Sequence, residues 1–208
     1  MIASMLQALF EPYIQVQADV WEGFANYLTL RNFEKNEIIK AADKKETHLY
    51  IITKGSAGLF VSKDGHDICI DLCYPGQFAG DYYSLLQQQT MPVSKGNAEL
   101  DNLLQQRSPI YVMALEPAEA LAISRQDLFM LYEQSDIGKM IARKVAELLY
   151  MQKQSQQIEL LTMTAEQRYM QMLEQYPDIL LNTASKHIAS YLGISPESLS
   201  RIKKKAAS

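Results

Sequence analysis

Three side chains near the carboxyl end of the chain have the chemistry needed to read DNA bases. Glu197, Ser200 and Arg201 are spaced three and four residues apart, which places them on one face of a helix. An arginine can donate two hydrogen bonds to O6 and N7 of guanine, a glutamate can accept from the N4 amino group of cytosine, and a serine can bind a base edge or a phosphate. The sequence therefore predicts a base-reading surface at these positions.

Cationic and hydroxyl side chains around this trio are suited to the DNA backbone. Lysine ammonium groups neutralise phosphates, and serine hydroxyls donate hydrogen bonds to them. The residues predicted to contact the backbone are Lys186, Ser195, Ser198, Lys203, Lys204 and Lys205. For the run of three lysines, the ordinary alternative is a solvated helix end.

Two short helices joined by a tight turn are the elements that would hold these side chains. Ala189 is small where two helices would cross, and Gly193, four residues later, permits a positive φ in the turn. Ser195 is a helix N-cap residue, and Pro196 suits the first helical position. An apolar seam would join the helices and comprises Ile188, Leu192, Ile194, Leu199 and Ile202. The pattern predicts a helix-turn-helix, with an ordinary helical hairpin as the alternative.

The charge of the chain is unevenly distributed along its length. The 208 residues carry a net charge of −4, yet residues 183–208 hold five basic side chains against one acidic one, which leaves −8 for residues 1–182. An acidic body with a basic end is a polarised molecule, and such polarity indicates a nucleic-acid partner at the basic end. Together with the predicted helix-turn-helix, it points to double-stranded DNA as that partner. With 48% apolar and 21% charged residues, the composition is that of a folded globular protein.

Short antiparallel strands are predicted over residues 31–80. Brief apolar runs at 49–52 and 59–61 alternate with turn signals, among them Asp64-Gly65 and residues 74–77. Strand patterns return at 110–113 and 118–123, and this spacing is typical of an antiparallel sandwich or barrel. In the strand after the Asp64-Gly65 turn, period-two alternation places Ile68, Ile70 and Leu72 on one face and Cys69, Asp71 and Cys73 on the other.

Helical patterns flank the strands. Residues 3–30 repeat apolar side chains at helical spacing with a break near Pro12, and residues 82–106 predict two helical pieces around a loop. Ser124 and Thr164 are predicted to begin later helices. Between them, residues 136–162 contain no proline and predict one helix roughly 38 Å long with a broad apolar stripe. This helix is longer than the β unit could easily cover, so we expect it to pair with a second copy in a homodimer.

Other classes of function lack the residues they need. Cys69 and Cys73 would lie roughly 13 Å apart on one strand, too far for a direct disulfide. The three histidines have no metal-ligand spacing, and no catalytic Ser/His/Asp or Cys/His set stands out, so neither a metal site nor enzymatic activity is expected. Without a run of 18 apolar residues or a basic, apolar leader, we expect a cytoplasmic protein with no membrane partner.

The order of these parts resembles the Crp/Fnr-type transcription regulators. The resemblance is carried by residues 49–55, 64–65 and 75–78, and most specifically by residues 188–202. It implies an α+β fold that begins with a double-stranded β-helix, a jelly-roll or cupin-like β-roll. The implied domains are a cyclic-nucleotide-binding-like sensor at 1–135, a dimerisation helix at 136–162 and an all-α helix-turn-helix domain at 163–208. Because the chain stops at Ser208, we expect this domain to lack a full wing.

A function follows from the resemblance. It implies a homodimer that reads an inverted repeat through the helix Pro196–Lys205 under the control of an effector in the β-roll, with RNA polymerase as a further partner. The family's base-reading trio of Glu, Ser and Arg falls on Glu197, Ser200 and Arg201 of this chain. Family members with that trio read half-sites of the TTGAT kind. The alternative is a small-molecule sensor or adaptor module with no sequence-specific DNA binding.

The effector pocket of the family would fall on Gly80, Asp81, Arg107 and Ser108. In its cyclic-nucleotide sensors, the Glu of a Gly-Glu pair holds the ribose hydroxyl, and the Arg of an Arg-Ser-Ala stretch holds the phosphate together with nearby backbone N–H groups. Here Asp81 is one methylene shorter than glutamate, and Pro109 has no N–H where a backbone donor is needed. These departures argue against a cyclic nucleotide, and no cofactor is assigned.

Overall fold

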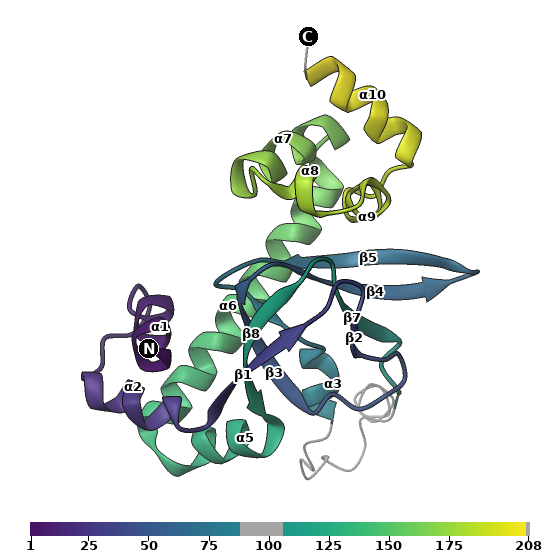
Figure 1. The fold of residues 1–208 in the computed structure, drawn as a ribbon. Coiled ribbons are helices and arrows are strands. Elements are labelled where there is room, and N and C mark those ends of the chain that lie inside the picture. Colours follow the sequence, from purple (N-terminus) through teal and green to yellow (C-terminus); the bar gives the residue numbers. More distant parts are fainter. Residues whose placement is uncertain (88–105, 207–208) are drawn as a thin grey trace, which may run out of the picture.

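Two four-stranded antiparallel sheets form the centre of the protein (Figure 1). The computed structural model describes residues 1–87 and 106–206. One sheet has the strand order β1-β8-β3-β6 and the other β2-β7-β4-β5. The strands are β1 (Leu28–Phe33), β2 (Ile38–Lys40), β3 (His48–Lys54), β4 (Ala57–Lys63), β5 (His66–Cys73), β6 (Phe78–Ala79), β7 (Ile110–Ala114) and β8 (Ala118–Ser124). This arrangement confirms the predicted α+β fold with its β-roll.

Apolar side chains from both sheets fill the space between them. Ile52, Leu59 and Val112 come from β3, β4 and β7 and are buried in one cluster. The ring of Tyr50 packs edge-on against Phe33 in the same cluster, with the centroids 5.7 Å apart. Removal of this apolar surface from water stabilises the roll, and it leaves the interior occupied by the protein's own side chains.

The hairpin of β4 and β5 turns at Asp64-Gly65, as predicted, with positive φ at both residues. The predicted alternation along β5 is wrong beyond Cys69. Phe60 pairs with Cys69 while Leu59 pairs with Asp71, so Ile70 is the extra residue of a β-bulge. As a result Asp71, Leu72 and Cys73 are all buried, whereas Ile68 and Ile70 remain exposed. Cys69 and Cys73 are both free thiols.

Two helices precede the sheets: α1 (Ile2–Phe10) and α2 (Ala18–Ala25). They pack together through Phe10 and Trp21, whose rings stack with centroids 5.7 Å apart. The chain breaks between them beside Pro12, as expected. The helical prediction up to residue 30 is wrong, because Leu28 begins β1 and pairs with Ile123 of β8. Pairing with a neighbouring strand here overrides the local helical spacing.

The helices α3 (Tyr82–Gln87), α5 (Arg125–Gln134) and α6 (Asp136–Thr162) follow later in the chain. The second helical piece expected within 82–106 falls largely outside the described residues. The hydroxyl of Ser124 accepts the N–H of Asp127 at 3.1 Å, so Ser124 caps α5 as predicted. The bounds of α6 match the predicted 136–162. Its first half packs on the N-terminal core through Ile141 and Val145.

The C-terminal part consists of α7 (Ala165–Gln175), α8 (Ile179–Asn182), α9 (Ser185–Tyr191) and α10 (Pro196–Ala206). Thr164 and Gln167 form a capping box at the start of α7. The short helix α8 was not predicted. In Figure 1, α10 lies at the end of the molecule away from α1 and α2, and the far end of α6 leads into this part. Within residues 1–87 and 106–206, no helix is long and apolar enough to cross a membrane.

Candidate nucleic-acid interface

Helices α9 and α10 form the predicted helix-turn-helix. Gly193 lies between them with φ of +68°, and the N–H of Ile194 donates to the carbonyl of Ala189 at 2.9 Å, which closes the turn. Ala189 is buried where the helices meet. The predicted seam is present: Ile188, Leu192 and Leu199 are buried, and Ile194 and Ile202 pack against them.

A change at the turn tests this geometry. In Gly193→Ala the new Cβ would lie 3.2 Å from Cδ1 of Leu160, and a side chain would occupy the left-handed region. We expect a loss of about 1–2 kcal/mol in the free energy of unfolding, measured by urea denaturation. Gly23→Ala is the matched control, because a Cβ there meets nothing within 4 Å and φ is not positive. Equal stability of the two variants would contradict the expectation.

The first turn of α10 is capped by its own serines. The hydroxyl of Ser195 accepts the N–H of Ser198 at 3.2 Å and lies at the same distance from the Ser198 hydroxyl. Hydrogen bonds from its own backbone N–H and from Ser195 hold the pKa of Glu197 below its usual value, with a further contribution from Arg201. Glu197 therefore presents a carboxylate at the start of the helix.

The predicted base-reading side chains share the exposed side of α10. Glu197, Ser200 and Arg201 are all exposed, whereas Leu199 turns inward to the seam. Since positions three and four residues apart on a helix are neighbours, the three side chains form one surface. α10 stands at the periphery of the molecule, so this surface is accessible (Figure 1).

The predicted phosphate-binding lysines lie around the same helix pair. Lys186 is exposed on α9, and Lys204 is exposed near the end of α10. Lys203 Nζ donates to the Ser185 hydroxyl at 3.0 Å. Lys205 Nζ lies 2.7 Å from a carboxylate oxygen of Glu166, with both side chains exposed. An exposed ion pair contributes at most about 1 kcal/mol, so a phosphate can replace Glu166 at little cost.

The helix-turn-helix is docked on β5, an arrangement that sequence reasoning missed. The N–H of Cys69 donates to the Ser190 hydroxyl of α9 at 2.8 Å. The rings of Phe60 and His187 meet edge to face with centroids 4.8 Å apart. Burial and the neighbouring charge of Lys186 lower the pKa of His187, so the neutral imidazole is favoured in this contact.

Further contacts join the β-roll to the C-terminal part and to α6. Tyr74 and Tyr176 stack with centroids 4.1 Å apart, and Gln77 Nε2 donates to the Tyr176 hydroxyl at 2.5 Å. The buried carboxylate of Asp71 forms an ion pair with Lys153 on α6. β5 is therefore tied to α6 as well as to α9.

Asp81, a predicted effector ligand, is already engaged within the chain. Its Oδ2 atom lies 2.7 Å from Nζ of Lys40, and the two side chains are 0% and 3% exposed. Lys40 Nζ also donates to the carbonyl of Ile110 at 2.6 Å. The second oxygen of Asp81 accepts the N–H of Ser84 at 3.0 Å and so caps α3. Sequence reasoning missed Lys40, because no motif marks a lone lysine 41 residues before its partner.

A second buried carboxylate supports the same turn. Glu46 Oε2 accepts the N–H of Asp81 at 3.1 Å, directly after Gly80, whose φ is +137°. Burial raises the pKa of Glu46, and hydrogen bonds from backbone N–H groups oppose that rise. Sequence reasoning did not single out Glu46.

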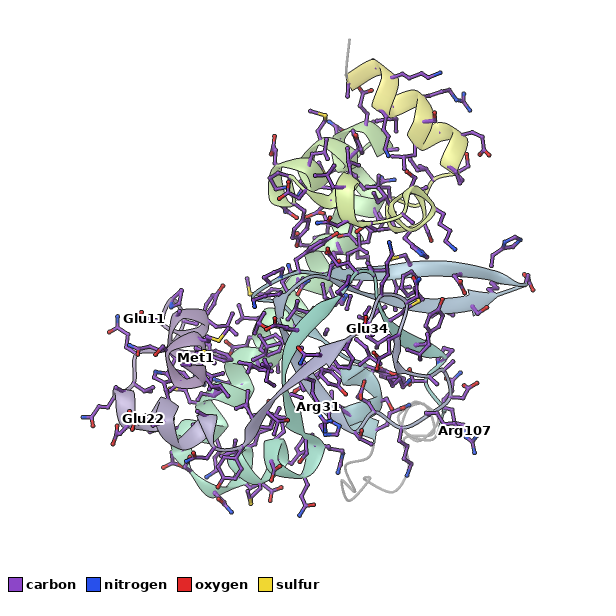
Figure 2. The ribbon with its side chains drawn as sticks, in the orientation of Figure 1. Met1, Glu11, Glu22, Arg31, Glu34 and Arg107 are labelled. Carbon is purple, nitrogen blue, oxygen red and sulfur yellow. The ribbon has the colours of Figure 1, made fainter. Side chains whose placement is uncertain are left out.

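The remaining predicted effector residues divide between the interior and the surface. Ser108 is buried, and its carbonyl accepts the N–H of Asp43 at 2.9 Å. Arg107 is exposed, and Figure 2 shows it at the outer edge of the β-roll. Asp81 and Ser108 are therefore buried, whereas Arg107 is on the surface. Within the part of the chain that the structure describes, no group of three or more His, Cys, Asp or Glu could hold a metal ion.

Comparisons with known proteins agree with this architecture. Residues 30–94 match the family described as the cyclic nucleotide-binding domain. FixK2 from Bradyrhizobium japonicum superposes with a TM-score of 0.62 at 17% identity, over 86% of this chain and 83% of that one. CLP, the c-di-GMP responsive global regulator of Xanthomonas campestris, gives 0.60 at 14%, over 92% of both chains.

A third solved structure, a regulator from Eubacterium rectale assigned to the Crp/Fnr family, gives a TM-score of 0.64 at 13% identity, over 91% of this chain and 83% of that one. No curated protein sequence matches this chain. At these identities the likeness shows a shared fold.

Proposed function

We propose that this chain, which has a cyclic nucleotide-binding domain and the fold of Crp/Fnr-type regulators, is a DNA-binding transcription regulator that acts as a homodimer. The observation that carries the proposal is the exposed face of α10. It places Glu197, Ser200 and Arg201 together on a helix-turn-helix. Lysines follow on the same helix, which is the arrangement expected of a major-groove recognition helix with backbone contacts beside it.

The second half of α6 supports the homodimer. Met151, Ile158 and Leu161 are 66%, 51% and 77% exposed in the single chain. Their spacing of seven and three residues places them on one face, as in the seam of a paired helix. The first half of α6 is buried against the chain's own core. The helix therefore leaves apolar surface for a second copy only along its second half.

A dimer through α6 would present two copies of α10. Two-fold symmetry relates them as an inverted pair, so they would read inverted half-sites about 34 Å apart, one turn of the DNA. The resemblance of the trio to that of family members makes TTGAT-type half-sites the first sequences to test.

We further propose that the effector of this β-roll is not a cyclic nucleotide. To bind a ribose hydroxyl, Asp81 would have to release Lys40, and an unpaired charge would then remain buried. Arg107, the candidate for the phosphate, is exposed, whereas Asp81 is buried. Under this proposal the β-roll keeps the fold of the family's cyclic-nucleotide sensors but binds a ligand of different chemistry.

Selection from a random DNA library tests the function directly. Purified full-length protein should enrich paired, inverted half-sites with centres about one helical turn apart. Affinity for the enriched site should fall steeply with salt, because the lysines release counterions from phosphates. Enrichment of unpaired sequences, or no binding at moderate salt, would sink the proposal and favour a sensor or adaptor that does not read DNA.

Loss of the central arginine should weaken specific binding. In Arg201→Ala we expect about 10- to 100-fold weaker binding to the selected site, with little change on random DNA, because a bidentate contact to guanine is lost. Gel-shift titration measures both affinities. Arg31→Ala is the matched control, since Arg31 is exposed on β1, far from α10 (Figure 2). Equal losses on specific and random DNA would assign Arg201 to a phosphate instead.

A further inference from the structure

His187 lies on α9, where the helix-turn-helix docks on the β-roll, and its residue is 7% exposed. Its ring meets Phe60 of β4 edge to face. Phe60 is fully buried and stacks in turn on Tyr111 of β7, with the ring centroids 5.2 Å apart. The imidazole of His187 is therefore part of the packing that holds α9 against the sheet.

A hollow of about 430 Å³ lies beside His187. Its lining comes from the β4–β5 turn, from β5, from α9 and from the start of α10. Among the described residues, no hydrogen bond or ion pair reaches the ring nitrogens of His187, and neither nitrogen is completely shielded from solvent. The hollow therefore gives protons access to an imidazole that has no partner for a positive charge.

The cationic groups near His187 disfavour a further positive charge. On α9 itself, Lys186 lines the same hollow. From α10, Lys203 Nζ donates to the hydroxyl of Ser185 at the start of α9, at 3.0 Å. From β5, His66 also lines the hollow and gains a positive charge in acid.

Asp67 is the single carboxylate that lines the hollow, and it has another partner. The hydroxyl of Tyr111 donates a hydrogen bond to it. β4 contributes the uncharged ring of Phe60 to the contact. Burial and the charge of Lys186 lower the pKa of His187, and the opposing attraction of Asp67 does not reverse that direction.

We propose that His187 is a pH-sensitive switch that controls the docking of the helix-turn-helix on the β-roll. The neutral imidazole packs on Phe60, and α9 remains docked on β5. A protonated imidazole would place a positive charge in this apolar contact beside Lys186, so protonation releases α9 from β5. α10 follows α9 through the turn at Gly193, and its position relative to α6 is then no longer fixed by the sheet.

The direction of the pH dependence follows from the same contact. In the released state His187 is in water, where a histidine has a pKa of about 6.5. The docked state lowers that pKa and so binds fewer protons than the released state. Docking is therefore strongest above a pH of about 6.5, weakens as the pH falls below it, and stops weakening once the docked imidazole is protonated as well.

Hydrogen–deuterium exchange of the full-length protein, measured by mass spectrometry, tests the proposal. The N–H of Cys69 donates to Ser190 of α9, so a β5 peptide that contains Cys69 reports whether α9 is docked. From about pH 7.5 to about pH 5.5, its protection, corrected for the intrinsic exchange rate, should fall by about 3- to 10-fold, the range expected when one ionisable group changes its environment. A peptide of β8, which is paired on both sides within its sheet, should keep its protection.

Substitution of each histidine identifies the group that titrates. His187→Gln should remove the pH dependence, because glutamine takes up no proton in this range. His48→Gln is the matched control, since His48 is also partly buried but lies on β3 in the other sheet. His66→Gln is a second control, since His66 is exposed and lines the same hollow. Both controls should respond to pH as the wild type does.

Unchanged protection of the Cys69 peptide in the wild type would overturn the proposal, whatever the variants do. The same holds if the pH dependence persists in His187→Gln or disappears in either control. If His187→Gln leaves the peptide unprotected at both pH values, His187→Phe replaces it, because a phenyl ring keeps the contact with Phe60 without a titratable nitrogen. It should be protected at both pH values, and failure to be so would also overturn the proposal. The samples contain no DNA, so the result is independent of the proposed function.

Discussion

Lys40→Met is expected to lower the free energy of unfolding by about 3–5 kcal/mol, because it leaves the carboxylate of Asp81 buried without its ion-pair partner. The methionine retains the length of the lysine stem, so little packing is lost. The lost charge-assisted bonds are the one to Asp81 and the one from Nζ to the carbonyl of Ile110. Since small domains have only about 5–15 kcal/mol of stability in total, urea denaturation should detect this change clearly.

Two further variants isolate the effect of burial. Lys54→Met removes the same charge from an ion pair with Glu119 in which the lysine side chain is 71% exposed, and should cost less than about 1 kcal/mol. Lys40→Met combined with Asp81→Asn should recover part of the loss, because no unpaired charge then remains buried. If Lys40→Met and Lys54→Met are equally stable, the Lys40–Asp81 pair does not hold the roll together.

Met151→Glu combined with Ile158→Glu is expected to convert a dimer into a monomer and to weaken binding to a two-half-site DNA by about 100-fold or more. The two carboxylates would face their counterparts in the second copy, where like charges repel and desolvation is costly. A monomer engages one half-site and loses the gain from simultaneous binding of both. Sedimentation equilibrium gives the mass, and gel-shift titration gives the DNA affinity.

Leu181→Glu is the matched control for the dimer prediction. Leu181 lies on α8 and is 82% exposed, so the same kind of change there should alter neither mass nor DNA affinity. Persistence of a dimer in the double variant would place the interface elsewhere. If the double variant lost DNA affinity but remained a dimer, the loss of affinity would not be caused by dissociation of the dimer.

Elements with strong local signals could be predicted from the sequence. The helix over 136–162 was correctly bounded, because its uninterrupted apolar stripe begins after Ser135, which caps it by accepting the N–H of Gly138. The caps at Ser124 and Thr164 were also correct, since capping depends on residues within one helical turn. The helix-turn-helix followed from the combination of Ala189, Gly193 and the apolar seam.

Features that depend on distant residues could not be predicted. Leu28 fits a helical repeat, and only its pairing with Ile123 of β8 makes it part of a strand. The Lys40–Asp81 pair and the hydrogen bond from Cys69 to Ser190 join elements that are far apart in the sequence. The resemblance located Gly80, Asp81, Arg107 and Ser108 as one pocket. In the structure Asp81 and Ser108 are buried, Arg107 is exposed, and Lys40 already pairs with Asp81.

The contact between α9 and β5 has a consequence for aggregation. β5 is the last strand of its sheet, and an exposed edge strand offers unpaired N–H and C=O groups to strands of other molecules. Ser190 accepts one of these edge donors, the N–H of Cys69, and α9 covers the strand around it. The helix-turn-helix part therefore also shields an open sheet edge, and any change that lifts α9 from β5 exposes a strand on which chains can assemble edge to edge.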